Sequence, residues 1–427
     1  LEIFFVSLSM YWLVENKKQF NIFVNLVKND LYIEVIPDFY NEHPCEQSIV
    51  GYYIRPITDK KGYILPVNHY ETGNLSQNDI VNFLKGISKF YCYDKKKLLH
   101  NFKHRNIFDI QINYKELQTD YSLILQDFQR RKISNSNTPI VKLYEYYEAK
   151  YEEIKEYIDK DYNLFYNNKV PLVFSVIESS GIKIDKKLFE KHFYENKKDF
   201  VFTQYNYTTL TTRPSNTFKK VNYAALNKDN GSRDCFIPRN DYFIEIDVSS
   251  YHILLLCQLL NYEFEVEDIH EYFASVYQTS YDKAKQLTFQ QIYGGIKSEY
   301  EHIPFFQKVK NYSNNLWSEF NSKGYIECPI SNYAFSKKDH PQMNSLKLMN
   351  YLLQNLETSN NVLILYDILK LLRGKQTKVV LYTYDSILLD VDKNEEEIVE
   401  KIKEVFRIFN LKIKCKNGKN YGNLIKC

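Results

Sequence analysis

Apolar and polar residues alternate in three parts of the chain, and each part predicts β-strands. Residues 49–67 alternate on both sides of a polar bend, as in a β-hairpin. Residues 242–248 (YFIEIDV) form a strand-like run that passes directly into an apolar helical pattern. Residues 379–391 (VVLYTYDSILLDV) predict two apolar strands joined by a polar turn. The chain is therefore expected to combine sheets with helices.

Helical periodicity dominates other segments. Residues 140–168 carry many charges and predict a solvated amphipathic helix. Residues 170–181 predict an apolar helix that ends at Gly181. The opening run, residues 1–14, is apolar, but it contains Glu2 and is short for a membrane span. We expect a buried strand or helix there.

One helix-like segment, residues 280–295, carries large side chains at steps of four. These residues share one helical face: Tyr281, Lys285, Phe289 and Tyr293. Such an aromatic stripe also occurs in helices that pack against a core. A lysine at its centre instead favours a triphosphate lying along the helix, with the rings left to stack on a base and a sugar.

Two aspartates stand where apolar strands end. Asp247 lies at the end of the first strand-like run, and Asp385 lies between the two later strands. A single aspartate at such a position is commonly a cap or turn residue. Two carboxylates on adjacent strands can hold a pair of divalent ions about 3.5–4 Å apart, and magnesium prefers such oxygen ligands. The pair alone does not separate a polymerase from a nuclease.

Composition sets only broad limits. The 427 residues leave room for about three domains. A formal net charge of +3 is compatible with nucleic-acid binding, which needs local basic patches rather than a large net charge. The seven cysteines include no C-x-x-C pair, so neither a zinc site nor a disulfide framework is indicated. We expect a soluble, intracellular protein without a membrane partner.

The order of these segments resembles that of the motifs of family A DNA polymerases, the group that includes bacterial DNA polymerase I. Motif A, usually D-Y-S-Q-I-E-L-R, resembles residues 247–254 (DVSSYHIL), and the family's D-I-H follows at residues 268–270. Motif B, K-x3-F-x3-Y-G, is matched in full by residues 285–294. Motif C, usually H-D-E, resembles residues 384–386 (YDS).

Weaker matches lie in the same order and imply contacts to DNA. TTLTTRPSN resembles the T-x-x-G-R-x-S segment, which makes Arg213 the counterpart of an arginine at the primer strand. Asn350 and Gln354 fit the N-x3-Q helix that contacts template and primer in the minor groove. Tyr384 of motif C is assigned to the DNA as well. The ending NGKNYGN resembles the closing G-x-N-W, with Tyr421 for the tryptophan.

The resemblance implies a role for each residue of the main motifs. Asp247 and Asp385 would hold two Mg²⁺ ions, one at the primer 3′-hydroxyl and one at the pyrophosphate leaving group. Lys285 would neutralise the incoming triphosphate. Phe289 would lie near the 3′ position of the sugar, and Tyr293 would stack at the nascent base pair.

Three positions depart from the family pattern. His252 replaces a glutamate that blocks a ribose 2′-hydroxyl, so discrimination against ribonucleotides is expected to be weakened but present. Tyr281 stands at the place of an arginine four residues before the motif B lysine. The triphosphate must therefore have fewer cationic contacts, or Lys283 must supply the missing one. Ser386 replaces the second acid of motif C, which is auxiliary to the two aspartates.

The implied fold is α/β (α+β), a right-hand polymerase with palm, fingers and a reduced thumb, preceded by a ribonuclease H-like exonuclease-type domain. The expected divisions are a degenerate 3′–5′ exonuclease-like domain at 1–162, a reduced thumb leading to the palm at 163–230, the palm with motif A at 231–267, the fingers with motif B at 268–340, and the palm with motif C at 341–427. The short thumb predicts distributive synthesis unless a processivity factor clamps the template.

The exonuclease-like region lacks most of the family's metal ligands. Its D-x-E positions are Ile36 and Asp38, and Arg105 stands for the aspartate of the second motif. Only the third motif, Y-x3-D, is matched, by Tyr157 and Asp161. We therefore expect no 3′–5′ exonuclease activity, because two metals cannot be held without the missing acids.

The sequence thus predicts a DNA-directed DNA polymerase whose partners are primer-template DNA and dNTPs. A single-subunit RNA polymerase is an alternative, since its motif C often reads H-D-S. A catalytically decayed DNA-binding factor is another, because the exonuclease site has already decayed. Compactness and an AT-rich codon bias, visible in 38 Tyr and 28 Phe, suggest a phage, plasmid or organelle-like replicon.

Overall fold

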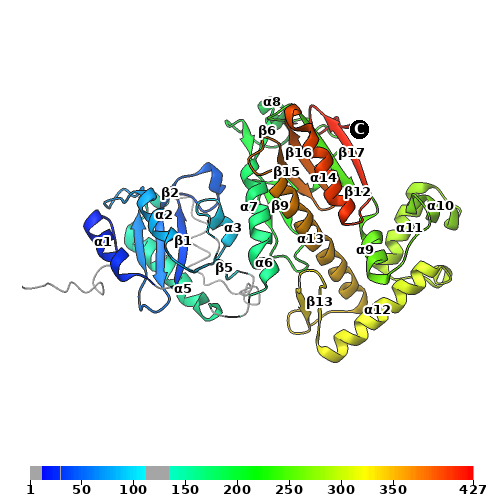
Figure 1. Ribbon diagram of the computed structural model, residues 1–427, viewed down its shortest axis with the longest axis horizontal. Coiled ribbons are helices and arrows are strands. Elements are labelled where there is room, and N and C mark those ends of the chain that lie inside the picture. The colour runs from blue at the N-terminus through cyan, green and yellow to red at the C-terminus, as the bar shows by residue number, and fades with distance from the viewer. Residues whose placement is uncertain are drawn as a thin grey trace, which may run out of the picture. The chain divides into compact units, whose positions relative to one another are not determined.

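The computed structural model describes residues 12–28, 30–104, 106–111, 134–158, 160 and 162–426. The chain divides into two compact units, residues 1–179 (unit 1) and 180–427 (unit 2). Each unit contains its own central sheet with helices packed around it (Figure 1). Most of the apolar opening run lies outside the described residues.

A five-stranded mixed sheet forms the centre of unit 1, with the strand order β3-β2-β1-β4-β5. Its strands are β1 (Leu31–Pro37), β2 (Ile49–Pro56), β3 (Tyr63–Pro66), β4 (Phe90–Cys92) and β5 (Ile107–Asp109). β1 pairs antiparallel with β2 and parallel with β4, so the first strand is central. The predicted hairpin is confirmed as β2 and β3.

Helices cover both faces of this sheet. The described helices up to residue 180 are α1 (Lys17–Leu26), η2 (Pro44–Glu46), α2 (Gln77–Lys85), α3 (Lys95–Leu99), η4 (Asn135–Asn137), α5 (Ile140–Ile154), η5 (Lys155–Tyr157), α6 (Leu164–Asn168) and α7 (Val170–Ser180). Apolar residues of α1, α2 and α3 pack on one face, and the tyrosine-rich side of α5 packs on the other. Alternate residues of β1 point into the apolar cores on the two faces of the sheet, because successive side chains of a strand point to opposite faces. The helix predicted to end at Gly181 is confirmed as α7, and Gly181 has φ +62.

Helix α5 is less solvated than its charge pattern predicts. Two of its charged residues turn inward and find partners on the sheet. Arg55 Nη1 donates to Glu148 Oε2 at 2.6 Å, and Lys150 Nζ lies 2.8 Å from Glu34 Oε1. A buried charge is tolerated only when it is paired in this way. The solvated helix predicted from the charge pattern therefore does not describe these two residues.

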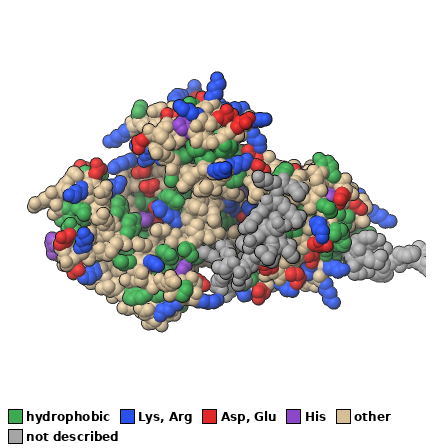
Figure 2. All heavy atoms as spheres, turned by 180° about the vertical axis from the view of Figure 1, so that it is seen from behind, with side chains coloured by type: hydrophobic (Ala, Val, Ile, Leu, Met, Phe, Trp, Pro, Cys, Tyr) green, Lys and Arg blue, Asp and Glu red, His purple; other side chains and the backbone are tan. Residues whose placement is uncertain are grey.

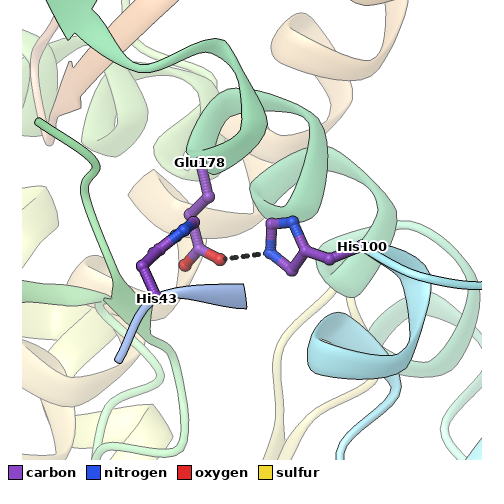
Figure 3. Close-up of side chains that lie close together, drawn as sticks. All are labelled: His43, His100 and Glu178. Carbon is purple, nitrogen blue, oxygen red and sulfur yellow. Dashed lines mark hydrogen bonds and ion pairs between the residues drawn. The ribbon is translucent and has the colours of Figure 1, made fainter. Parts of the chain in front are cut away.

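A buried ion cluster joins α7 to α3 and η2 in unit 1. Lys96 Nζ lies 2.5 Å from Glu178 Oε1, and His100 Nε2 lies 2.9 Å from Glu178 Oε2. Figure 3 shows His43 beside the same carboxylate. Burial alone would raise the pKa of Glu178, but Lys96 and His100 lower it to about 2. Burial would lower the pKa of His100, but hydrogen bonds to Cys45 and Glu178 raise it to about 9.

Two histidines and a glutamate at this spacing could hold a metal ion. Here, however, the ammonium of Lys96 already neutralises the carboxylate. Metal binding also requires a neutral imidazole, whereas a pKa of about 9 keeps His100 protonated at neutral pH. The cluster is therefore a network of buried ion pairs.

We predict that this network stabilises unit 1 in a pH-dependent way. The folded pKa of His100, about 9, lies above the ordinary value of 6.5. Its contribution is thus fully present below the ordinary pKa and is lost as the pH rises through about 9. The wild type should exceed the His100→Gln variant by on the order of 3 kcal/mol near pH 6 and by little near pH 10.

Urea unfolding followed by Trp12 fluorescence measures this difference. A Trp317→Phe background removes the other of the two tryptophans, which lies in unit 2. His302→Gln is the control, because His302 is an exposed histidine of unit 2. A stability difference for His100→Gln that stays constant with pH would contradict the ion-pair account.

The central sheet of unit 2 has the order β15-β16-β12-β17-β18, and every neighbouring pair is antiparallel. Its strands are β12 (Tyr242–Val248), β15 (Lys378–Thr383), β16 (Ser386–Val391), β17 (Ile413–Gly418) and β18 (Ile425–Lys426). The three strands predicted in residues 242–248 and 379–391 are confirmed. One face packs against residues of two of the small sheets, among them Phe218 and Phe236.

The small sheets of unit 2 are formed by short strands. They are β6 (Ile182–Ile184), β7 (Phe200–Val201), β8 (Tyr205–Asn206), β9 (Ser215–Phe218), β10 (Val221–Asn222), β11 (Phe236–Ile237), β13 (Tyr325–Glu327) and β14 (Ala334–Ser336). Their orders are β11-β6-β7, β10-β9-β8 and β13-β14.

The helices of unit 2 include the predicted aromatic-striped segment. They are α8 (Lys186–His192), η6 (Tyr223–Ala225), α9 (Tyr251–Leu260), α10 (Ile269–Tyr277), α11 (Tyr281–Gly294), η7 (Ser298–Tyr300), α12 (Pro304–Lys323), α13 (Ser345–Leu371), η8 (Lys393–Glu395) and α14 (Glu396–Ile408). α11 ends where predicted, and Gly295 follows it with φ +94. Within the described part of the chain, no helix has the length and apolar character needed to cross a membrane.

Candidate active site

The two aspartates named from the sequence meet at one edge of the central sheet of unit 2. Asp247 pairs with Ser386 on one neighbouring strand and with Lys414 on the other. Asp385 precedes Ser386 in the turn from β15 to β16. The Val248 N–H donates to the Asp385 carbonyl at 2.8 Å, which ties the end of β12 to this turn. The carboxylates therefore come from adjacent strands.

The turn that carries Asp385 has an unfavourable backbone conformation. Tyr384 has φ +63, a region that costs a residue with a Cβ roughly 1–2 kcal/mol. Two contacts hold it there. Asn361 Nδ2 donates to the Tyr384 carbonyl at 2.6 Å, and the Arg213 guanidinium lies 3.8 Å from the centre of the Tyr384 ring. Strain held by surrounding contacts is common at functional sites.

A cavity of about 580 Å³ opens at this edge of the sheet, within the size range of small-molecule sites. Residues named from the sequence that line it are Arg213, Asp247, His252, Tyr281, Lys285, Phe289, Tyr293 and Asp385. Charged residues that the sequence analysis did not name also line it: Lys228, Glu245, Glu267, Glu357, Lys412, Lys414 and Lys416. On the molecular face shown in Figure 2, acidic and basic side chains are also intermixed.

Negative charge is concentrated around the two aspartates. Burial and the charges of Asp385 and Glu245 raise the pKa of Asp247 to about 6. Burial raises the pKa of Asp385, and the charge of Glu357 raises it further. A divalent cation would relieve this repulsion, and carboxylate oxygens are ligands that Mg²⁺ prefers. The donor set at this edge therefore fits a divalent ion.

Helix α11 presents the predicted face to the cavity. The Phe289 and Tyr293 rings are stacked, with centroids 5.8 Å apart and an interplanar angle of 8°. Lys285 lies between these rings and the start of the helix and is exposed. Tyr281 donates its hydroxyl to Asp268 Oδ2 at 3.3 Å, so it is tied to the cap of α10. The face thus offers a cation beside a flat aromatic surface.

A series of polar contacts lies beneath Tyr293. His252 Nδ1 is hydrogen-bonded to the Tyr293 hydroxyl, and His252 Nε2 lies 3.4 Å from Glu357 Oε1. Arg213 Nε lies 2.9 Å from Glu357 Oε2. Burial and the charge of Glu357 raise the pKa of Tyr293, so its hydroxyl stays protonated at neutral pH. Glu357 was not named from the sequence.

Glu357 belongs to a run of buried polar residues in the middle of α13. With the exception of a leucine, every residue from Asn355 to Asn361 is polar and buried. Asn355 Nδ2 donates to Thr212 Oγ1 at 2.7 Å, and Asn361 Oδ1 accepts from the Tyr251 hydroxyl at 2.8 Å. The signal that could have revealed them is the polar string QNLETSNN inside an otherwise apolar helix.

Four residues named from the sequence do not line the cavity: Lys283, Asn350, Gln354 and Tyr384. Lys283 is exposed on α11, and because it lies two residues from Lys285 it does not share the face of the helix that lines the cavity. Asn350 Nδ2 donates to the Tyr293 carbonyl at 3.2 Å. Gln354 Oε1 accepts from a threonine hydroxyl at 3.0 Å. Both polar side chains of α13 therefore support the cavity from outside.

The positions expected for exonuclease metals are placed as follows in unit 1. Ile36 is buried in β1, and Asp38 accepts hydrogen bonds from two serines around η4. Tyr157 is buried in η5. Arg105 and Asp161 lie outside the described residues. On the described part of β1, the carboxylate that faces α5 belongs to Glu34, and its partner is the Lys150 ammonium.

The fold of the chain is similar to that of a solved polymerase domain. No protein-family model matches the sequence, and no curated protein matches it. The chain is similar to a solved structure described as the POL domain of Pol1 from M. smegmatis in complex with DNA primer-template and dNTP. The TM-score is 0.69 at 12% sequence identity, and the match covers 96% of this chain and 99% of that chain. The chain thus has the mixed α/β fold of a polymerase domain.

The raised pKa of Asp247 predicts that its carboxylate destabilises the folded protein. With a folded pKa of about 6 against an ordinary 3.8, stability falls as the pH rises between these values. Without divalent metal at pH 7.5, Asp247→Asn should therefore be more stable than the wild type, by about 1 kcal/mol once solvent screening is allowed for. Near pH 4 the two should be equal.

Thermal unfolding at the two pH values measures this, with Asp367→Asn as the control. Asp367 is an aspartate of α13 that pairs with Lys370 near the surface. Lower stability of Asp247→Asn at pH 7.5 would mean that favourable contacts, and not repulsion, dominate at this carboxylate.

Proposed function

We propose that the chain is a template-directed DNA polymerase that adds deoxynucleotides to a primer 3′-hydroxyl. One observation carries the proposal: Asp247, Lys285 and Asp385 come from three distant segments, and all line one cavity. Their order along the chain is that of family A motifs A, B and C. The likeness to a polymerase domain solved with primer-template DNA and dNTP supports the same function.

In the proposed reaction the incoming dNTP occupies this cavity. Lys285 binds the triphosphate, because it is the cation on the α11 face. Phe289 and Tyr293 offer their parallel rings to the sugar and the base. Two Mg²⁺ ions bound by Asp247 and Asp385 would activate the primer 3′-hydroxyl and stabilise the pyrophosphate leaving group.

The primer and template would contact residues that surround the cavity. Arg213 and Tyr384 stack on each other at the turn that carries Asp385. Asn350 and Gln354 lie one turn apart on α13. We assign all four to DNA positioning, while the sequence of the product comes from template pairing.

His252 would set the sugar selectivity. Its Nδ1 is hydrogen-bonded to the Tyr293 hydroxyl, so this nitrogen is not available to a 2′-hydroxyl. A hydroxyl buried without a partner is unfavourable, and ribonucleotides should therefore still be disfavoured. The imidazole replaces a carboxylate of the family, so the discrimination should be weaker than usual.

We propose that unit 1 is a degenerate exonuclease-like domain with a ribonuclease H-like fold. Its mixed sheet, with β1 in the centre and β2 antiparallel to it, supports this fold. The third exonuclease motif, Y-x3-D, stays assigned to Tyr157 and Asp161, while Glu34 on β1 is paired with Lys150. Burial alone would lower the pKa of Lys150, but Glu34 raises it. Because Ile36 and Arg105 stand at positions where the exonuclease needs acids, two metals cannot be held, and we propose that proofreading is absent.

The segment proposed as the thumb is short. Within its described part, residues 163–230, the longest helix is α7, with 11 residues. Few contacts to the duplex backbone are then possible, and binding should weaken with salt. We propose distributive synthesis in the absence of a processivity factor. The proposed palm and fingers keep the division given from the sequence, while unit 1 extends to residue 179.

Extension of a primed DNA template with Mg²⁺ and dNTPs tests the proposal. Asp385→Asn keeps the shape of the side chain but removes its charge, and it should lower the rate by about a thousandfold or more, since several kcal/mol of charge stabilisation are lost. Asp367→Asn, which changes an exposed aspartate of α13, should extend like the wild type. An unchanged rate in Asp385→Asn would contradict the assignment of the metal site.

Repeating the assay with rNTPs separates the alternatives. Preferred use of dNTPs supports a DNA polymerase, whereas preferred use of rNTPs would favour a single-subunit RNA polymerase. Binding of primer-template without any extension would favour a non-catalytic DNA-binding factor.

A further inference from the structure

Glu357 lies where three elements around the nucleotide cavity meet. Its side chain is only 3% exposed, and its carboxylate contacts both Arg213, which also donates from Nη2 to Oε1 at 3.5 Å, and His252. One oxygen is 2.9 Å from Arg213 Nε, in the loop before β9, and the other is 3.4 Å from His252 Nε2 on α9. A buried carboxylate without such partners would be strongly unfavourable. The carboxylate of Glu357 therefore interacts with a residue of the loop and with a residue of α9.

The position of Glu357 also determines how His252 meets Tyr293. The proton of an imidazole is placed on the nitrogen that faces an acceptor, and the other nitrogen is then free to accept. Glu357 Oε1 lies 3.4 Å from Nε2 and is the acidic group that would draw the proton there, in which case Nδ1 accepts from the Tyr293 hydroxyl. The charge on α13 thus fixes the direction of a hydrogen bond to α11.

We infer that Glu357 is a positioning residue for the incoming nucleotide, acting through His252 to hold the Tyr293 ring. The inference rests on the proposed function, because it assigns a role to a residue that supports the same cavity. With its hydroxyl held, Tyr293 stays parallel to Phe289, 5.8 Å away. The two rings then form one surface for the sugar and base.

A purely structural role would not require this contact. Helix α13 is already joined to α11 by the Asn350 side chain, which donates to the Tyr293 carbonyl. It is joined to the turn of Asp385 by Asn361, which donates to the Tyr384 carbonyl. These bonds hold the backbones together when the charge of Glu357 is removed. Its loss should therefore release the Tyr293 side chain while leaving the fold intact.

A double-mutant cycle between Glu357→Gln and Tyr293→Phe tests the inference. Single-nucleotide incorporation is measured with dNTP on a primed template. In the wild-type background, Glu357→Gln should lower kcat/KM by about tenfold, mostly through KM, because one charge-assisted contact is lost. In the Tyr293→Phe background, which lacks the hydroxyl, the same change should lower kcat/KM less than about twofold.

The matched control is Thr358→Val, which alters the adjacent buried residue of the same helix with little change in shape. It should leave kcat/KM unchanged in both backgrounds. Thermal unfolding of each variant checks that the fold persists. An equal loss from Glu357→Gln in both backgrounds, or no loss in the wild type, would overturn the inference.

A second measurement does not depend on turnover. In protein labelled with ¹⁵N-histidine, the His252 signals are identified by their loss in His252→Gln. They should show the Nε2-protonated form and should shift in both Glu357→Gln and Tyr293→Phe, but not in Thr358→Val. Absence of a shift in either of the first two variants would refute the contact series. The expected shifts in a protein that cannot extend a primer would refute the proposed function and leave the contact series intact.

Discussion

The buried polar run of α13 is the interaction on which the geometry of the cavity depends. Buried polar groups are generally hydrogen-bonded or paired, so the members of the run that have partners, such as Glu357 and Asn361, require those partners to take one position. Asn361 holds both the Tyr251 hydroxyl, just after β12, and the Tyr384 carbonyl, just before β16. It thus fixes the backbone on either side of the two aspartates. Glu357 adds the charge that orients Arg213 and His252. An apolar helix of the same shape would pack as well but would not align these elements.

Buried acidic residues of this chain occur in two kinds of environment. In unit 2, Asp247 and Asp385 stay close together with raised pKa values, which is unfavourable for the protein alone. Groups perturbed in this way are concentrated at functional sites. In unit 1, Glu34 has the Lys150 ammonium as its own cation, and Glu178 has Lys96. We propose metal binding for Asp247 and Asp385, which line the cavity and for which no salt bridge is seen among the described residues.

Local patterns in the sequence were sufficient for the elements that carry the main motifs. The runs around Asp247 and Asp385 predicted β12, β15 and β16, and the spacing of Lys285 and its neighbours predicted the cavity face of α11. These predictions succeeded because strand and helix periodicity are properties of consecutive residues. Glu357 and the inward-turned Lys150 were missed, because their partners lie about a hundred positions away in the chain. The partner of Glu357 is His252, and that of Lys150 is Glu34. The charge pattern of α5 predicts a solvated helix, and only the tertiary structure reveals the buried pairs.

The central claim is that strand β12 and the β15–β16 turn together hold divalent ions beside a bound nucleotide. Binding of Mn²⁺, followed by electron paramagnetic resonance, tests it most directly in a complex with a dideoxy-terminated primer-template and the next dNTP. The account predicts two bound ions per chain in the wild type, fewer in Asp385→Asn, and two in the control Asp367→Asn. Retention of two equally tight ions in Asp385→Asn would contradict the account.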